Sequence, residues 1–291
     1  MASTLGIDGG ASATKWALRD SNCTYKEGTS EPIDGHIYRP ASKVRLEKVL
    51  LQIRDECGSV EIDSIVAGLT GLGGESESDV HRLFSTIFPT SRIVLMTDIV
   101  LGYRANLNLG EGIFLYAGTG SIAIHLKESG EMIRAGGWGY LLGDEGAGYW
   151  IGREAIRRTL KLMDTGKKLG NLHNAVLEMM SAHNWNEIKS FVYSEDRSSI
   201  AEIAEIVVKM AEDGEEEART ILRNASLSLV GLAQQIQDIL GRQDMPIVLG
   251  GGIVRASEYL VKELKNALGE NALVSNVRIA NKAADLALTI K

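Results

Sequence analysis

The sequence predicts an α/β protein composed of two related lobes. A strand, a turn of small residues and a second strand occur in "STLGIDGGASATKWALRD" and again, about one hundred residues later, in "EGIFLYAGTGSIAIHLKE". Between these units, segments with helical apolar spacing alternate with short apolar strands, which is typical of a partly parallel sheet covered by helices. A chain of 291 residues is long enough for two such lobes.

In the first lobe, an apolar strand ends at Asp8, and "TKWALR" alternates as its partner strand after the small-residue turn. Two helix–strand steps follow. The predicted helices are "RLEKVLLQIRDEC" and "SDVHRLFSTIF", and the strands after them are "IDSIVAGLTGLGG" and "RIVLMTD". The last strand ends at Asp98, and "IVLGYRANL" after it is expected to be a helix.

The second lobe is predicted to be richer in helices. We place the lobes at residues 1–110 and 111–280, and we expect a C-terminal helix within 281–291 to pack back on the first lobe. "SIAEIAEIVVKMAEDG" predicts one helix, and "DGEEEARTILRNASLSLVGLAQQIQDIL" predicts a long one with a capping box formed by Asp213 and Glu216. Its apolar stripe is Ile221, Leu222, Ala225, Leu229, Leu232, Ala233 and Ile236. "MPIVLGGGIVRASEYLVKEL" then predicts a strand, a glycine turn and a helix.

Composition excludes several classes of protein. The formal net charge is −7 and no basic block stands against it, so we expect no nucleic-acid partner. Cys23 and Cys57 form no CxxC pair, so neither a zinc site nor a disulfide framework is indicated. No apolar run is long enough to span a membrane, and the first residues lack the pattern of a signal peptide. We therefore expect a cytoplasmic protein without a membrane partner.

Three turns of glycine, serine and threonine are candidates for phosphate binding, since such turns aim backbone N–H groups at one point. They span residues 8–15, 118–121 and 250–252, and an ordinary hairpin turn is the alternative for each one alone. "GGASATK" lacks the Gly-Lys-Ser/Thr ending of a P-loop. "GTGSIA" matches a loose dinucleotide motif, but the strand-like "SIAIHL" stands where that motif needs a helix.

Two carboxylates and a run of glycines and rings mark a candidate small-molecule site. Asp98 follows a strand at the edge where α/β sheets bind ligands, although helix capping is the alternative role. Asp144 lies in "AGGWGYLLGDEGAGYWIGREAI", which begins at Ala135. Aromatic side chains with polar tips often line such sites, and glycines let the backbone approach a ligand closely. A long loop with glycine turns is the alternative for this segment.

Five segments resemble, in the same order, those of the N-acetylglucosamine kinase and BadF/BcrA-type ATPase family. They are "LGIDGGASATK", "MTDIVLGYRA", "LYAGTGSIA", "GGWGYLLGDEGAGYWIGREA" and "IVLGGGIVRAS", and the resemblance covers nearly the whole chain. That family belongs to the superfamily of sugar kinases, actin and heat-shock ATPases. The resemblance implies a two-lobe, actin-like ATPase fold of ribonuclease H-like type, with duplicated lobes and a central cleft that holds ATP and sugar.

The resemblance also implies roles for single residues. Asp98 stands at the catalytic carboxylate, and Asp8 at a position that holds Mg²⁺ through water. The implied ATP-binding residues are Gly10, Ser12, Thr14, Gly118, Thr119, Gly120, Gly251 and Gly252. The implied sugar-binding residues are Asp34, His36, Ser121, Gly137, Trp138 and Asp144.

The sequence departs from the family pattern at several of these positions. Ala11 and Ala13 replace a glycine and a polar or basic residue of the first turn, and Ile122 replaces an asparagine found in some members. Asp34 stands where many members have asparagine. Because an ionised carboxylate can only accept hydrogen bonds, Asp34 leads us to expect a preference for a free amino sugar or a plain hexose over an N-acetylated one.

The sequence therefore predicts a sugar kinase that uses ATP and Mg²⁺ and is expected to form a homodimer. One alternative is an ATP-driven activator of a dehydratase or reductase, but such activators carry an iron–sulfur cluster on interface cysteines, and Cys23 and Cys57 lie at other places. The other alternative is a sugar-binding regulator without catalysis, which the retained Asp98 disfavours. The sequence does not identify the sugar or the hydroxyl that receives the phosphate.

Overall fold

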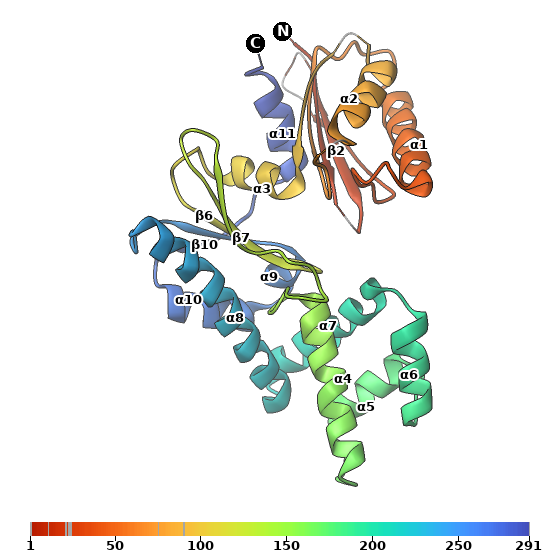
Figure 1. The fold of residues 1–291 in the computed structure, drawn as a ribbon, viewed down its shortest axis with the longest axis vertical. Helices are drawn as coiled ribbons and strands as arrows, with labels where there is room; N and C mark the ends of the chain where they lie inside the picture. The colour runs from red at the N-terminus through yellow and green to blue at the C-terminus, as the bar shows by residue number, and fades with distance from the viewer. Residues whose placement is uncertain are drawn as a thin grey trace. The chain divides into compact units, whose positions relative to one another are not determined.

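The computed structural model describes residues 2–10, 12–20, 22, 25–74, 76–89 and 91–290, so Ala11 and Cys23 lie outside the described residues. The chain divides into two compact units (Figure 1). Unit 1 consists of Met1–Asn106 and Asn276–Lys291, and unit 2 of Leu107–Ser275. The first junction lies close to residue 110, where the sequence places the end of the first lobe.

Unit 1 contains a mixed sheet with the strand order β3-β2-β1-β4-β5. Strands β1, β2 and β3 form antiparallel pairs, whereas β4 and β5 continue the sheet in parallel with β1. The strands are β1 (Thr4–Gly9), β2 (Thr14–Arg19), β3 (Tyr25–Ser30), β4 (Ser64–Leu69) and β5 (Arg92–Thr97). The helices are α1 (Pro40–Cys57), α2 (Ser76–Ile87), α3 (Asp98–Asn106) and α11 (Ile279–Ala287).

The two faces of this sheet are covered by different helices (Figure 1). Leu5 and Ile7 belong to the core that includes the apolar faces of α1 and α2. Gly6, between them, points to the other face, where a Cβ atom would lie only 2.0 Å from the carbonyl oxygen of Ala280 in α11. Alternation along β1 thus gives one face to bulky side chains and the other to direct backbone contact with α11.

Polar contacts also fasten α11 to unit 1. The hydroxyl of Thr4 donates to the carbonyl oxygen of Ala284 at 2.7 Å. Tyr25 donates to Asp285 at 2.5 Å, and the guanidinium of Arg278 donates to both carboxylate oxygens of Glu27. The last helix of the chain is therefore an integral part of the unit that contains the first strand.

Unit 2 repeats the same sheet topology. Its order, β10-β9-β6-β7-β8, again joins an antiparallel β6-β7-β8 meander to two parallel strands. The strands are β6 (Ile113–Ala117), β7 (Ser121–Leu126), β8 (Met132–Gly136), β9 (Ile247–Gly250) and β10 (Ala272–Val274). The predicted α/β class and the internal duplication are confirmed, because β6 and β7 correspond to β1 and β2.

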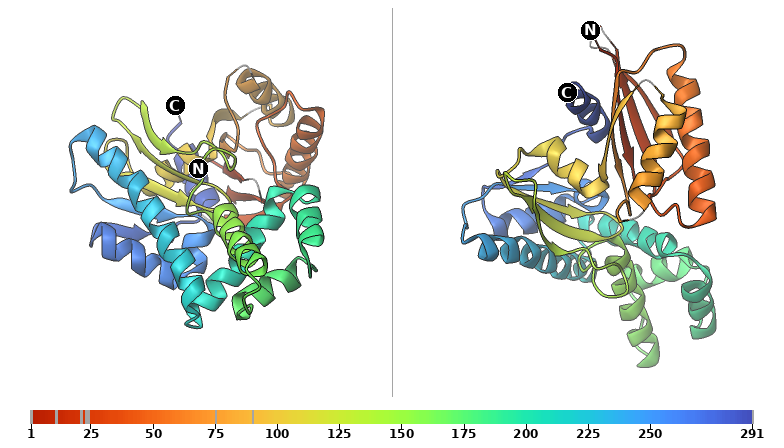
Figure 2. Two further views of the ribbon diagram at one scale, coloured as in Figure 1. Left: turned by 60° about the horizontal axis from the view of Figure 1, so that its bottom comes forward. Right: turned by 45° about the horizontal axis from the view of Figure 1, so that its top comes forward.

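Most of the helices lie in unit 2. They are α4 (Gly148–Asp164), α5 (Asn171–Met179), α6 (Trp185–Ser194), α7 (Arg197–Glu212), α8 (Glu216–Leu240), α9 (Gly252–Ala256) and α10 (Glu258–Leu268). Helix α8 packs along β6, β7 and β8, as the views of Figure 2 show. The predicted apolar stripe of α8 faces the core, with Leu232 partly buried and its other members buried.

Three details differ from the sequence-based expectation. The capping box at Asp213 and Glu216 is wrong, because Asp213 ends α7 and the carboxylate of Glu215 caps α8 by accepting from the N–H of Ala218 at 2.6 Å. The edge strands β3 and β8 were not predicted. The helix expected after the third glycine turn is divided at Ser257, whose side chain caps α10.

The contact between Gly6 and α11 makes a specific prediction. Gly6→Ala is expected to destabilise the protein by about 3 kcal/mol, because the new methyl group would overlap backbone atoms that have no room to move. Gly231→Ala in α8 is the matched control, since no atom lies within 4 Å of its Cβ position. That substitution is expected to stabilise the helix by about 0.5–1 kcal/mol. Equal unfolding free energies for the two variants in urea titrations would contradict this packing.

Candidate functional site

The ends of three parallel strands form the core of the candidate site in unit 1. The register pairs Gly9 of β1 with Leu69 of β4, and Leu69 with Thr97 of β5. The next residue along each strand is therefore Gly10, Thr70 or Asp98. This is the carboxyl edge of the sheet, where α/β proteins bind ligands.

Asp98 is the first residue of α3 and is half-buried. Its Oδ1 accepts from the N–H of Ile99 at 2.9 Å, and the hydroxyl of Thr70, from the neighbouring strand, lies beside its carboxylate. Burial raises the pKa of Asp98 above its ordinary value, while these two donors act in the opposite direction. A carboxylate with a raised pKa at a strand end is suited to accept a proton.

The β1–β2 turn lies beside Asp98 at the same edge. The N–H of Gly10 donates to the carbonyl oxygen of Ala13 at 3.1 Å, and Ser12 is exposed. Asp8, half-buried, pairs in register with Gly68 of β4. The side chain of Thr14 is fully buried, and its hydroxyl donates to the carbonyl oxygen of Glu31 at 2.7 Å. The hydroxyl of Thr14 therefore helps to hold the hairpin.

Asp34 and His36 lie on a loop that packs against the residues following β4. Asp34 forms a parallel bridge with Thr70, and the His36 ring occupies the space beside Gly71. Gly71 has φ +68°, and a Cβ there would lie 2.0 Å from Cε1 of the His36 ring. Only glycine permits this turn with the ring so close.

The carboxylate of Asp34 is engaged within its own loop. Oδ1 accepts from the N–H of His36 at 2.9 Å and lies 3.2 Å from Nδ1 of its ring. Oδ2 accepts from the hydroxyl of Ser42 at 3.0 Å. Because both oxygens already accept hydrogen bonds within the loop, we expect Asp34 to hold the loop and not to select a free amino sugar.

In unit 2, the turn between β6 and β7 is held by the start of α4. The N–H of Gly118 donates to the carbonyl oxygen of Gly120 at 2.9 Å. The N–H groups of Gly148 and Tyr149 donate to the carbonyl oxygens of Gly118 and Thr119 at 2.8 and 3.2 Å. Two N–H groups at the start of α4 thus fix the turn through its carbonyl oxygens.

Asp144 lies against this turn. A Cβ on Gly120 would be 2.4 Å from Oδ2 of Asp144, and the carboxylate accepts from the N–H groups of Ser121 and Gly139. Burial raises the pKa of Asp144, while these donors and the positive charge of Arg197 act in the opposite direction. Asp144 has φ +61°, a left-handed conformation that is costly for a residue with a side chain.

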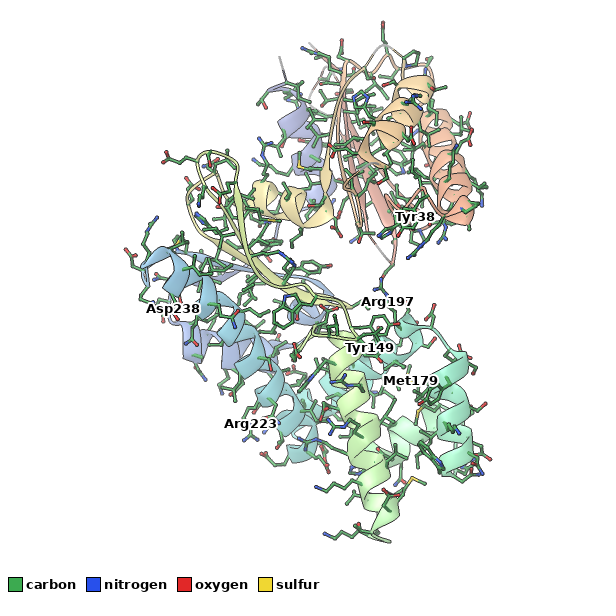
Figure 3. All side chains as sticks on the ribbon, in the orientation of Figure 1. Tyr38, Tyr149, Met179, Arg197, Arg223 and Asp238 are labelled. Carbon is green, nitrogen blue, oxygen red and sulfur yellow. The ribbon has the colours of Figure 1, made fainter. Side chains whose placement is uncertain are left out.

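Arg197 stands at the first position of α7, at the end of the helical layer that also carries Tyr149 (Figure 3). Tyr149 meets Tyr140 edge to face, with ring centroids 4.9 Å apart. Tyr149 and Arg197 thus come from helices α4 and α7, which border the glycine-rich segment. Tyr140 and Tyr149 both belong to the glycine-rich segment, and their contact explains part of its aromatic content.

The rest of the glycine-rich segment exposes apolar side chains. Trp138 is 60% exposed, and Leu141 and Leu142 are each 77% exposed. Gly137 has φ +70° and packs on Ile122, whose side chain would be 2.6 Å from a Cβ at that position. Ser121 is buried, and its hydroxyl donates to the carbonyl oxygen of Glu145 at 2.8 Å. Its side chain supports the loop.

The third turn lies at the end of β9, next to the first residues of the β6–β7 turn. Gly251 has φ +106°, and a Cβ there would lie 2.1 Å from the carbonyl oxygen of Ala117. Gly252 is exposed, and no atom lies within 4 Å of its Cβ position. The structure therefore brings the second and third turns together in unit 2.

Thr70 is a candidate site residue that the sequence-based list omits. It follows a buried strand, as Asp98 does, and the rule that selected Asp98 also selects it. The glycines around it in "GLTGLGG" indicate a turn and give no signal that the hydroxyl has a role.

The described part of the chain contains neither a cluster of metal ligands nor a helix suited to a membrane. There, no group of three or more His, Cys, Asp or Glu side chains is arranged to bind a metal ion. Cys57 is buried, which raises the pKa of its thiol to about 11 and leaves it protonated. None of the described helices has the length and apolar character needed to cross a membrane.

The duplicated sheets, each with a hairpin turn at the carboxyl edge of its central strand, define an α/β fold that is shared with solved structures of candidate N-acetylglucosamine kinases. The chain belongs to the BadF/BadG/BcrA/BcrD ATPase family, whose pattern matches residues 5–284. This confirms the resemblance found in the sequence.

Individual relatives agree with this assignment. The chain is 26% identical over 283 residues to an N-acetylmuramic acid/N-acetylglucosamine kinase of Clostridium acetobutylicum, covering 92% of this chain and 90% of the relative. It is 26% identical over 302 residues to an N-acetyl-D-glucosamine kinase of Dictyostelium discoideum, covering 97% and 94%. The crystal structure of a candidate N-acetylglucosamine kinase from Chromobacterium violaceum superposes with a TM-score of 0.77 at 24% identity, covering 98% of this chain and 99% of that one.

Proposed function

We propose that this protein is an ATP-dependent kinase that transfers the γ-phosphoryl group of ATP to a hydroxyl of a hexose or amino sugar. The observation that carries the proposal is the half-buried Asp98 carboxylate, which lies at the same sheet edge as the Gly10–Ala13 turn. The names of the relatives support a sugar as the acceptor. A homodimer and a cytoplasmic location, where ATP is supplied, complete the proposal.

The turns supply the groups for ATP. In unit 1 these are the backbone of Gly10 and the exposed Ser12, and in unit 2 the 118–120 turn with the Thr119 hydroxyl. Gly251 and Gly252 would lie against the nucleoside, since the open space at Gly252 admits a flat group. Backbone N–H groups suit phosphate because they are donors that need no side-chain ordering.

Asp8 is the residue proposed to hold Mg²⁺, through water. Its half-buried carboxylate at the strand end fits this role, because Mg²⁺ keeps several waters and takes few protein carboxylates beside the phosphates. When bound, Mg²⁺ neutralises charge on the phosphates. Among the protein groups, Asp98 performs the proton transfer: it accepts the proton of the sugar hydroxyl while that oxygen bonds to the γ-phosphorus and the bond to ADP breaks.

His36, Gly137, Trp138 and Asp144 are the proposed sugar contacts. Asp144 fits because its two backbone donors leave lone pairs free for sugar hydroxyls. Trp138 offers an exposed ring face to the apolar side of a sugar. Asp34 and Ser121 act behind them by holding the loops. The activator alternative is not favoured, since Cys57 is a buried, protonated thiol.

The function is tested by coupled ADP release over glucosamine, N-acetylglucosamine, N-acetylmuramate, N-acetylmannosamine, glucose and mannose. We expect at least one sugar to accelerate ADP release and to yield a phosphorylated sugar in equal amount. ADP release that is independent of every sugar, with no phosphorylated product, would exclude a sugar kinase acting on this panel.

For Asp98, the prediction concerns turnover and pH. Asp98→Asn is expected to lower kcat by about 10²- to 10⁴-fold, as loss of a general base does, with a smaller effect on sugar binding. An exposed aspartate titrates near about 3.9. Burial raises the pKa of Asp98, so Asp98 becomes protonated at a higher pH than an exposed aspartate would. As the pH is lowered, wild-type kcat should therefore begin to fall at this higher pH. The variant should lack this acid limb. Near-normal kcat in the variant would show that Asp98 is not the base and serves only to cap the start of α3.

Thr119 is predicted to serve ATP. Thr119→Val keeps the side-chain shape but removes the hydroxyl, so the apparent KM for ATP should rise or kcat should fall by about tenfold, the effect of losing one hydrogen bond to a charged group. Circular dichroism should show an intact fold. Thr220→Val, on the exposed face of α8, is the control and should leave ATP kinetics unchanged. If both variants behave alike, the second turn does not bind phosphate.

The contacts of Asp34 predict that it does not read the sugar nitrogen. Asp34→Asn should change the ratio of kcat/KM for glucosamine and N-acetylglucosamine by less than about twofold, because an asparagine can accept from His36 and donate to Ser42 in its place. Asp79→Asn, which alters an exposed ion pair, controls for the loss of charge. A shift of about tenfold toward the acetylated sugar would instead show direct recognition.

A further inference from the structure

Thr70 joins two of the three parts of the unit 1 site through its backbone. Its N–H donates to the carbonyl oxygen of Gly9 at 3.0 Å, at the start of the β1–β2 turn. Its carbonyl oxygen accepts from the N–H of Gly35 at 2.8 Å, in the loop that contains Asp34 and His36. The residue is therefore fixed between the turn and the loop before its side chain is considered.

The side chain of Thr70 reaches the third part, Asp98. The Asp98 carboxylate accepts from the N–H of Ile99 in its own helix at 2.9 Å. The pairing of Leu69 with Thr97 places the Thr70 hydroxyl, from the neighbouring strand, beside the same carboxylate, where it acts to lower the pKa of Asp98. The Ile99 donor moves with α3, so it fixes the carboxylate only relative to that helix. The Thr70 donor fixes the carboxylate relative to the sheet, the turn and the loop.

The neighbour of Thr70 has a matching role toward the loop. Gly71, with φ +68°, leaves the space that the His36 ring fills. The dipeptide Thr70–Gly71 thus contacts the proposed base on one side and a proposed sugar-binding ring on the other. A shift of this dipeptide would displace both groups.

We propose that Thr70 is a positioning residue for the phosphoryl transfer. Its hydroxyl holds the Asp98 carboxylate so that the oxygen facing the sugar is set relative to the loop that contains His36. This inference rests on the proposed function, specifically on Asp98 as the base. It adds a residue that acts on the reaction through Asp98 without touching the substrate.

The test compares Thr70→Val, Thr70→Ala and Thr70→Ser, each in the wild-type and the Asp98→Asn background. In the wild-type background, loss of the hydroxyl should lower kcat by about 10- to 100-fold, the range for a hydrogen bond to a charged group. KM for sugar and for ATP should change by less than about threefold, and Thr70→Ser should restore kcat to within about threefold of wild type. The alanine variant serves if the valine variant does not fold.

The double variants separate positioning from a general structural role. In the Asp98→Asn background, Thr70→Val should lower kcat no further, because the carboxylate on which the hydroxyl acts is already lost. Thr159→Val is the matched control, a buried threonine of α4 whose hydroxyl donates to a carbonyl oxygen, and it should leave kcat unchanged.

The inference is overturned if serine fails to rescue, if only KM changes, or if Thr70→Val lowers kcat equally in both backgrounds. These outcomes leave the kinase assignment intact, since Asp98→Asn alone tests the base. Near-normal kcat of Asp98→Asn would overturn the base assignment together with the inference.

Discussion

The parallel register of β1, β4 and β5 is the constraint on which the unit 1 site depends. Because Gly9, Leu69 and Thr97 lie in one row, the chain leaves all three strands at the same level. A turn of small residues, a hydroxyl and a carboxylate follow at that level. A register shift of one residue in β5 would turn its side chains to the opposite face and move Asp98 away from Thr70.

The close packing of α11 on β1 helps to fix β1 in this register. The Gly6 position admits backbone contact with α11, and the neighbouring small side chains Ala280, Ala283, Ala284 and Ala287 are buried. The corresponding device in unit 2 is Gly251, which touches the backbone of Ala117 where β6 ends. In each unit, a glycine (Gly6 or Gly251) therefore allows two backbone segments to contact each other directly at or near the central strand.

The sequence predicted the parts of the fold that local pattern determines. The alternation of helices and strands, the repeated hairpin and the buried stripe of α8 follow from apolar spacing, which burial enforces along each element. Strand β3 was missed because its side chains are mostly exposed and polar, so no apolar alternation marks it. Glu215 was missed as the cap of α8 because Asp213 and Glu216 fit the usual spacing equally well in sequence.

The sequence indicates candidate site residues, but it does not indicate the partners of their side chains. Asp98 follows from its place after a strand. The hydroxyls of Thr14 and Ser121 and the carboxylate of Asp34 have the right chemistry for ligands, yet each is used within the protein. Their partners lie 17, 24 and 8 residues away in the chain, and only the folded backbone brings them within reach.

The most direct measurement is a crystal structure of the protein with a sugar that it phosphorylates and a non-hydrolysable ATP analogue. Sugar kinase action at the unit 1 sheet edge predicts one sugar hydroxyl within about 2.6–3.2 Å of an Asp98 carboxylate oxygen, the reach of a general base. The Thr70 hydroxyl should remain bonded to the same carboxylate. A sugar bound elsewhere, with Asp98 still contacting only Ile99 and Thr70, would contradict the account.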